Sequence, residues 1–313
     1  ETVLGVLPGH FLTKKGLGIR AIKICVFSIL LGLIFSFLFA FLNLNFSRFV
    51  FAFLREYLVF FLGAFCGILV FSDERKIEGI LIFVLSGALG FFALRFPGEG
   101  QVFVAFLGFF SLSQILLSRI KRMKKQREKD EEVDNSIILL SFLGAFLGWV
   151  CDFFPAIATP AQIATLVFPI VKGPESFLSI TSAISSSHAI NSLVSLISIG
   201  KARTGVTLEI IEIVNRENVL FYLAISATSF FISITILLIS INKIVNFLQK
   251  INFLYLNALL GVYIFVLSAF YGVFGIVLLI TTTCVGILAQ LIGARRIHMM
   301  SFLLVPVMVN LLS

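Results

Sequence analysis

Polar side chains recur at helical spacing between residues 177 and 199, inside an otherwise apolar stretch. The sequence places them at every third or fourth position, with Asn191 beside them: Thr181, Ser185, His188, Ser192 and Ser195. Residues at this spacing share one face of a helix. In hydrocarbon such a face turns inward, where it either binds neighbouring helices or lines a substrate path. Both interpretations are open, and the second predicts substrate-binding roles for Ser185, Ser186, His188 and Asn191.

Asp152 is the one acid set within an apolar tract of membrane depth, directly after Gly148-Trp149-Val150-Cys151. An ionisable group at that depth is costly, and it indicates an ion ligand or a proton carrier. Trp149 favours a second interpretation, because tryptophan also marks the membrane interface. Asp152 is therefore an ion-coupling candidate, with a place among lipid headgroups as the alternative.

Two prolines follow Asp152 within the same apolar tract, in the segment Phe154-Pro155-Ala156-Ile157-Ala158-Thr159-Pro160. Proline removes a backbone donor and breaks a helix. Such a break is tolerated at membrane depth only where protein or a wet cavity surrounds it. A half-helix starting near Ala161 would direct its N-terminus at a ligand there, which favours an anion such as a carboxylate. We expect substrate contacts from Pro155, Ala156, Ala158 and Pro160, together with the turn at Pro8, Gly9 and His10.

The composition decides the environment of these residues. Of 313 residues, 59% are hydrophobic and 13% are charged, and the mean hydropathy is +1.09. A soluble domain carries about a quarter charged residues. The predicted fold class is all-α, a polytopic transmembrane helical bundle that crosses the membrane about eight to ten times. Apolar stretches predict spans at 21–43, 50–71, 78–95, 101–118, 218–241, 252–269, 271–292 and 298–312, besides the helices 137–151 and 177–199.

Basic residues set the predicted orientation. The segment 119–136 is the most polar in the chain and should be a charged cytoplasmic loop. Counting the predicted spans back from this loop places the basic residues near Lys14 and Arg75 on the cytoplasmic side as well. A basic loop followed by four spans occurs twice, which predicts two parallel repeats. We expect residues 1–118 to form the first repeat, truncated at its front, and residues 137–313 to form the second, opened by a broken or re-entrant helix region at 137–199.

Other chemistry finds little support in the sequence. The four cysteines form no CxxC pair or zinc spacing. Protease, hydrolase and nucleotide-binding motifs are absent, so we expect no enzyme, no cofactor and no metal centre. Basic residues are spread through short gaps, which argues against nucleic acid as a partner. His298 is interpreted as an interface residue.

The run from Gly9 to Ala21 resembles a stretch of the TctA family, the large permeases of tripartite tricarboxylate transporters. The shared core is Gly9, Lys14, Lys15, Gly16, Arg20 and Ala21. The segment 154–162 looks like the family's Pro-Gly-x-Gly loop, with alanines at 156 and 158 where the family has glycines. The polar helix ends in Gly-Lys-x-Arg-x-Gly at 200–205, as in an archaeal-type branch.

This resemblance implies a multi-pass permease of the cell membrane. It implies ion-driven secondary transport of an organic acid, a di- or tricarboxylate, fed by a solute-binding protein with a small membrane subunit. Two alternatives stay open at this point. One is a noncatalytic or degenerate membrane subunit, and the other is a membrane enzyme that acts on a lipid-linked substrate.

Overall fold

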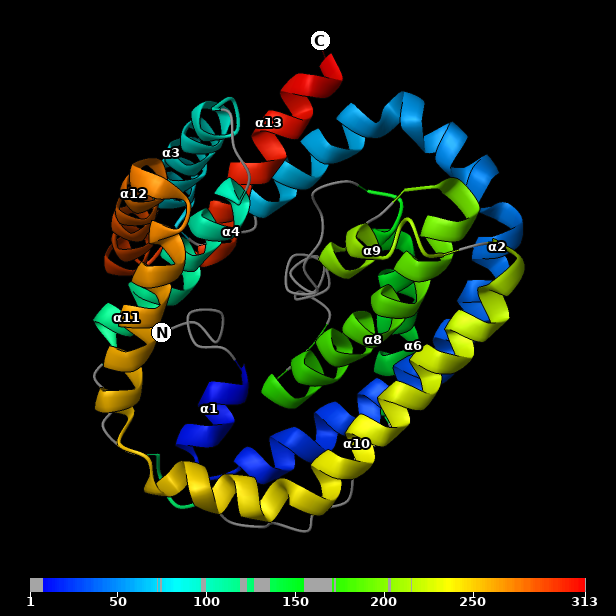
Figure 1. Ribbon diagram of the computed structural model, residues 1–313, viewed down its shortest axis with the longest axis horizontal. Coiled ribbons are helices and arrows are strands. Elements are labelled where there is room, and N and C mark those ends of the chain that lie inside the picture. The colour runs from blue at the N-terminus through cyan, green and yellow to red at the C-terminus, as the bar shows by residue number, and fades with distance from the viewer. Residues whose placement is uncertain are drawn as a thin grey trace. The chain divides into compact units, whose positions relative to one another are not determined.

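The computed structural model describes residues 8–71, 73, 75–96, 100–118, 123–126, 136–154, 171, 173–201, 204–214 and 216–312. Every regular element in these ranges is a helix (Figure 1). The chain divides into two compact units. Unit 1 contains Val59–Met123 and Gln249–Ser313, and unit 2 contains Val6–Leu58 and Lys124–Leu248.

The described helices fit a membrane protein. Four of them are long and apolar enough to cross a bilayer: α2 (Gly18–Phe71), α3 (Lys76–Ala93), α10 (Val219–Lys250) and α12 (Gly272–Ile292). Shorter apolar helical stretches cover Gln101–Leu117, Ser136–Cys151, Phe253–Ala269 and Arg296–Leu312. Large apolar side chains on these helices, such as Phe49 and Phe60, are exposed, as expected of a surface that faces lipid. The predicted all-α, polytopic fold class is confirmed.

The prediction of two separate spans at 21–43 and 50–71 is wrong, because both lie in the single helix α2 of 54 residues. No glycine or proline interrupts residues 43–50. The polar side chains there are also bound, since Asn45 Nδ2 donates to Phe41 O and Ser47 Oγ donates to Ser198 Oγ. Ser47 therefore does not compete for the helix backbone, and Asn45 bonds back to the preceding turn without ending the helix. At 1.5 Å per residue the helix is about 80 Å long, more than twice the hydrocarbon thickness of roughly 30 Å.

The segment at Pro8 is also helical, where we predicted a turn. Helix α1 runs from Pro8 to Lys14. Proline is favoured in the first turn of a helix, because its missing N–H would have no partner there. Gly16, with a φ of 84°, ends this helix and leads into α2.

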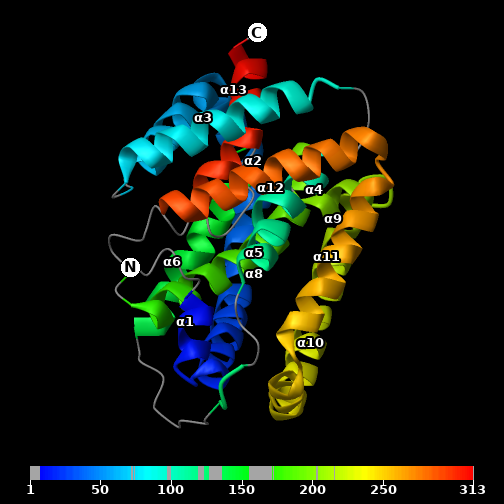
Figure 2. The same cartoon turned by 90° about the vertical axis from the view of Figure 1, so that its left-hand side faces the viewer.

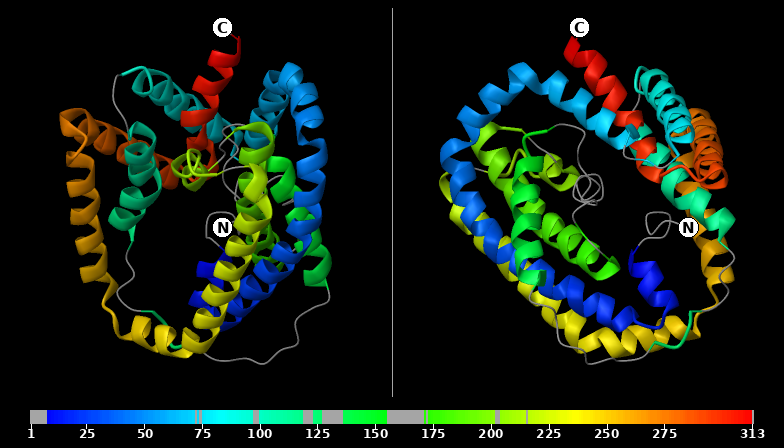
Figure 3. Two further views of the ribbon diagram at one scale, coloured as in Figure 1. Left: turned by 45° about the vertical axis from the view of Figure 1, so that its right-hand side comes forward. Right: turned by 180° about the vertical axis from the view of Figure 1, so that it is seen from behind.

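In unit 2, helix α8 (Pro174–Ile199) packs against α6 (Ser136–Cys151) and against the first part of α2. Figures 1 and 3 show α6 beside α8, and α10 alongside α2. An apolar cluster holds α2, α8 and α10 together, with Leu33, Val194 and Leu223 among its buried members. Short helices at Gly205–Glu209 (α9) and Arg216–Asn218 connect α8 to α10.

In unit 1, helix α3 packs against α13 (Ser301–Leu312) and α12 (Figure 2). Helix α12 also packs against α4 (Gln101–Phe106), a π-helical turn (Leu107–Leu112) and α5 (Ser113–Leu117). Buried Phe109 and Phe302 lie in the apolar core of this unit, with ring centroids 5.7 Å apart. Helix α11 (Phe253–Ala269) precedes α12, and a short 3-10 helix (Arg296–Met300) precedes α13.

Helices α3, α11 and α12 begin and end within two residues of the spans predicted for them. Helix α10 extends to Lys250, beyond the predicted end at 241. It stops where Asn252 caps the next helix, its side-chain oxygen accepting a hydrogen bond from Leu254 N.

Candidate functional site

Small residues bring α6 and α8 into backbone contact. Ser141, the pair Gly144 and Ala145, and Gly148 recur at a spacing of three or four residues on α6, and all are buried. A Cβ at Gly148 would lie 2.7 Å from the backbone oxygen of Ile184. Small residues are what allow transmembrane helices to approach so closely. Since α6 ends at Cys151, this contact carries the next residue, Asp152, to the middle of α8.

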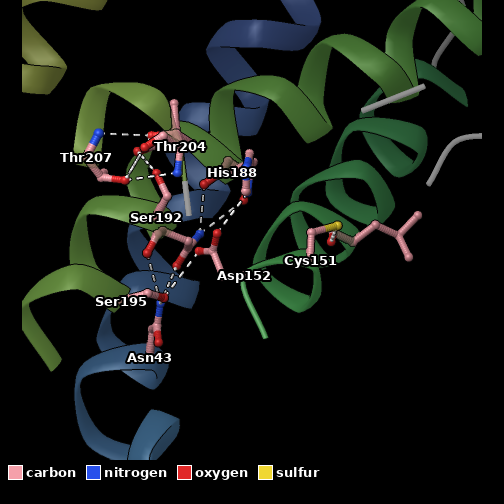
Figure 4. A network of polar contacts seen from close by, with 12 residues as sticks. Asn43, Cys151, Asp152, His188, Ser192, Ser195, Thr204 and Thr207 are labelled. Carbon is pink, nitrogen blue, oxygen red and sulfur yellow. Dashed lines mark hydrogen bonds and ion pairs between the residues drawn. The ribbon is translucent and has the colours of Figure 1, made fainter. Parts of the chain in front are cut away.

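Asp152 and His188 form a buried pair at this place (Figure 4). His188 Nδ1 lies 2.8 Å from Asp152 Oδ1, and the side chains are 9% and 0% exposed. The ring N–H is not aimed at the carboxylate, so the contact is a close electrostatic pair rather than an aligned hydrogen bond. His188 Nε2 is buried and has no hydrogen-bond partner among the described residues. The full burial of Asp152 within the chain contradicts its placement among headgroups.

Trp149, the residue that suggested an interface, packs inside unit 2 instead. Its ring stacks on Phe39 of α2, with centroids 5.6 Å apart and an interplanar angle of 13°. It also meets Phe153 edge to face at 5.6 Å. These aromatic contacts bind the end of α6 to α2 within the unit.

Residues of α8 and α2 complete the polar cluster around Asp152. Ser195 Oγ donates to Asp152 Oδ2 at 3.4 Å, and Asn43 Nδ2 of α2 donates to Ser195 Oγ at 2.9 Å (Figure 4). Asn191 Nδ2 donates to the backbone oxygen of Ser187 at 3.0 Å and to its Oγ at 3.2 Å. Ser195, Asn191 and Asn43 are all fully buried. We call Asn43, Asp152, His188, Asn191 and Ser195 the α8 cluster.

The other hydroxyl groups of α8 serve helix packing. Ser187 Oγ donates to Ala145 O of α6, and Ser28 Oγ of α2 donates to Ser179 Oγ. Four others donate to carbonyl groups of their own helix: Thr181, Ser185, Ser186 and Ser192. The predicted single polar face is therefore divided. Ser185 is exposed, away from the buried cluster, and Ser186 packs against Gly32 of α2.

The predicted contacts at the front of the chain lie elsewhere on α8. Pro8 is buried, Gly9 faces Leu178 near the start of α8, and His10 is exposed. Ten residues of helix separate Leu178 from His188, which is about 15 Å. Partial desolvation and the charge of Lys14 lower the pKa of His10. Pro155, Ala156, Ala158 and Pro160 lie outside the described residues.

Sequence reasoning missed Asn43 and a bidentate ion pair. Arg20 Nε lies 2.7 Å from Glu175 Oε1, and Arg20 Nη2 donates to Glu175 Oε2 at 2.9 Å, which fixes the start of α2 to the start of α8. Asn43 was visible as an amide inside an apolar run. Its partner could not be found from sequence, because 152 positions separate it from Ser195.

Comparison with known proteins identifies the family. The model of the tripartite tricarboxylate transporter TctA family matches residues 1–301. The chain belongs to the TctA family. An uncharacterized protein of Methanocaldococcus jannaschii is 27% identical over 324 aligned residues, covering 98% of this chain and 80% of that protein. No solved structure matches.

Membership in the TctA family defines the class of protein. This chain is a multi-pass membrane permease of the tripartite tricarboxylate transporter type, and it is not an enzyme. Tripartite transporters of this kind also involve a small membrane subunit and a solute-binding protein. The resemblance drawn from Gly9–Ala21 and from the second half of the chain is thus confirmed at the level of the family.

Unit 1 of this TctA chain holds a second Asp–His pair, which corrects the interpretation of His298 as an interface residue. His298 is fully buried, and its Nε2 lies 2.8 Å from Asp73 Oδ2. Asp73 also accepts hydrogen bonds from Arg75 N and Arg295 N. Burial raises the pKa of the Asp73 carboxyl, but these donors and the charge of Arg295 outweigh it and hold the pKa below its usual value. A Cβ at Gly79 would lie 2.8 Å from the His298 ring, so a glycine makes room for it.

Proposed function

We propose that this permease carries an organic acid, a di- or tricarboxylate, coupled to the movement of an ion, with Asp152 as the ion-coupling residue. The observation that supports the proposal is the Asp152–His188 pair, buried between α6 and α8 with a separation of 2.8 Å. An ionisable pair inside a membrane protein is costly to bury. Transporters use such groups as ion or proton sites.

The same cluster suits a carboxylate substrate. His188 Nε2 is a buried nitrogen without a partner among the described residues, and an imidazole N–H can donate a hydrogen bond to a carboxylate. Asn191 and the proline-rich segment 155–160 are the predicted neighbours of that substrate. Ser185, Ser186 and the Pro8–His10 segment are further candidates along α8. Binding of a second carboxylate group by any of them stays a prediction.

A ligand screen tests the proposal. Purified protein in detergent is heated with di- and tricarboxylates, with and without sodium, and its melting temperature is measured. We expect a dose-dependent rise with at least one acid. His188→Ala should raise the half-saturating acid concentration at least 10-fold, because it removes the candidate donor. Ser226→Ala is the matched control, since Ser226 donates only within α10, to Tyr222 O.

Uptake assays test whether the protein transports the acid. The permease is reconstituted into vesicles with its small membrane subunit and solute-binding protein, and uptake of a labelled acid is followed. Asp152→Asn should abolish ion-driven uptake while it preserves the melting shift with the acid. Ion-driven uptake at the wild-type rate in Asp152→Asn would contradict the role given to Asp152. A failure of every acid to shift the melting temperature or to be taken up would contradict the substrate class.

A further inference from the structure

The amide nitrogen of Asn43 lies among oxygen atoms of α8. Its Nδ2 is 2.9 Å from Ser195 Oγ, 3.2 Å from the backbone oxygen of Asn191 and 3.5 Å from Asn191 Oδ1 (Figure 4). Ser195 Oγ is in turn 3.4 Å from Asp152 Oδ2. The NH₂ group of Asn43 is therefore surrounded by acceptors from two side chains and one backbone carbonyl.

The orientation of these acceptors is fixed by the rest of the cluster. Asn191 donates two hydrogen bonds to Ser187 through Nδ2, so its Oδ1 has to face the opposite way, toward Asn43. Ser187 is itself fixed, because its Oγ donates to Ala145 O of α6 at 2.7 Å. The oxygen atoms thus remain directed at this place whether or not the Asn43 amide is there.

Asn43 itself is incompletely satisfied in this arrangement. Its Oδ1 is buried and has no hydrogen-bond partner among the described residues, although the side chain is 0% exposed. A buried acceptor without a partner is unusual and requires an explanation. Rotating the amide by half a turn exchanges Nδ2 and Oδ1, which differ little in size. The Asn43 oxygen would then face both oxygen atoms of Asn191, and a cation between them would offset their repulsion.

We propose that the α8 cluster binds a small monovalent cation, and that Asn43 supplies its amide oxygen when the cation enters and its amide nitrogen when the cation leaves. The ligands are Asn43 Oδ1, Asn191 Oδ1, Ser195 Oγ and Asp152 Oδ2. The inference rests on the proposed function, since it names the ion that Asp152 couples. It adds a residue of α2 to a site otherwise built from α6 and α8.

The chemistry of the ligands selects the class of ion. Oxygen atoms from carboxylate, amide and hydroxyl groups suit hard cations, not soft metals. Among the described residues the site includes one carboxylate, whose charge a monovalent cation balances and a divalent one exceeds. Asp152 also follows the C-terminus of α6, where the helix dipole favours positive charge.

His188 lies against the same carboxylate. Its Nδ1 is 2.8 Å from Asp152 Oδ1, whereas the proposed cation ligand is Oδ2, which is 3.4 Å from Ser195 Oγ. Two neighbouring groups bond to backbone carbonyls instead: Cys151 Sγ donates to Leu147 O, and Arg48 Nε donates to Ser198 O.

Cation titrations of the purified full chain test the inference without any organic acid. The melting temperature is measured against NaCl, LiCl and KCl, with choline chloride keeping the ionic strength constant. We expect a saturable rise with at least one of the three inorganic cations. Asn43→Ala should raise its half-saturating concentration at least 10-fold. Asn45→Ala is the matched control on the same helix, because Asn45 is exposed and donates to Phe41 O of its own turn; it should leave the titration unchanged.

A second variant keeps the test decisive if Asn43→Ala does not fold. Ser195→Ala removes one oxygen ligand and should weaken the same titration, whereas Asn43→Asp keeps an oxygen and should preserve it. Equal shifts of the melting temperature with choline and with the inorganic cations would overturn the inference. Half-saturating cation concentrations of Asn43→Ala and Ser195→Ala equal to the wild-type value would also overturn it. In those cases a melting shift with an organic acid would still support the proposed substrate. A cation shift without any acid shift would instead overturn the substrate class alone.

Discussion

At the scale of single residues, the described part of the chain contains two Asp–His contacts of equal length in different surroundings. Asp73 accepts from two backbone N–H groups and lies 3.5 Å from Arg295 Nε, besides its contact with His298. Asp152 lies beside an imidazole whose second nitrogen has no partner among the described residues. We therefore assign a structural role to the Asp73 pair, and we keep the functional proposal for Asp152 and His188.

The low pKa of Asp73 predicts an acid-sensitive contribution to stability. A carboxyl group whose pKa is lower in the folded than in the unfolded chain stabilises the fold above the unfolded value of about 3.9, and this contribution disappears as the pH falls through the folded value. Asp73→Asn should lower the melting temperature at pH 7, and its difference from the wild type should shrink below about pH 4. Glu78→Gln, at a partly exposed position in the first turn of α3, is the control that removes a neighbouring acid and leaves Asp73 in place. A difference that is independent of pH would contradict the role of Asp73.

At the scale of elements, small residues decide which helices meet. The α6–α8 contact depends on glycines at 144 and 148, and the α3–α13 contact depends on glycines at 87 and 90. In each case an added Cβ would meet backbone or side-chain atoms of the facing helix. Hydrocarbon supplies no hydrophobic force between helices, so close packing and buried hydrogen bonds must hold them together.

Gly148→Ala tests the contact that positions the α8 cluster. Its Cβ would lie 2.7 Å from Ile184 O and 2.8 Å from Ser187 Cβ, so the helices must separate. We expect a loss of about 1–3 kcal/mol of stability, the usual cost of overpacking. Gly67→Ala on α2 is the control, because a Cβ there meets nothing within 4 Å. It should be neutral or slightly stabilising, since alanine favours helix over glycine. Equal melting temperatures for both variants would show that the α6–α8 contact tolerates a methyl group.

At the scale of the whole molecule, one contact links two basic segments that are far apart in sequence. Gln126 Oε1 accepts from Gly18 N at 2.7 Å, and Gln126 Nε2 donates to Thr13 O at 3.1 Å. Residues 124–126 of the charged loop therefore lie against the connection between α1 and α2. This contact requires both segments to be on one side of the membrane, and the distribution of basic residues predicts the cytoplasmic side.

Cysteine labelling tests that orientation. Lys15→Cys and Lys129→Cys are introduced separately after replacement of Cys25, Cys66, Cys151 and Cys284, and a membrane-impermeant maleimide is applied to intact cells and to inverted vesicles. Both positions should react in inverted vesicles only. The positive control for intact cells is an exposed position on the opposite surface, which is first identified by cysteine scanning. Reaction of Lys129→Cys in intact cells would contradict the predicted orientation, and reaction of the two positions from opposite sides would contradict the Gln126 contact.

The parallel repeats remain a prediction. Their proposed boundaries, 1–118 and 137–313, rest on a recurring order of basic loop and spans in the sequence. The compact units follow a different division, because α2 belongs to both of them and each unit combines an early with a late part of the chain. The packing of the helices therefore does not test the repeat, because a repeat is a similarity between two segments of the sequence.

The sequence by itself determined that the chain is helical, lies in a membrane and belongs to the TctA family, and it singled out Asp152 and His188. Hydropathy, helical spacing and short motifs are local properties, and they do not depend on which helices meet. Only the tertiary structure decided that 21–43 and 50–71 form one helix, that Asp152 faces His188, and that Asn43 and Glu175 find partners about 150 positions away. Those outcomes depend on how helix faces lined with small residues fit together. Contacts across these faces fix side chains that are far apart in sequence, and no local pattern relates such side chains.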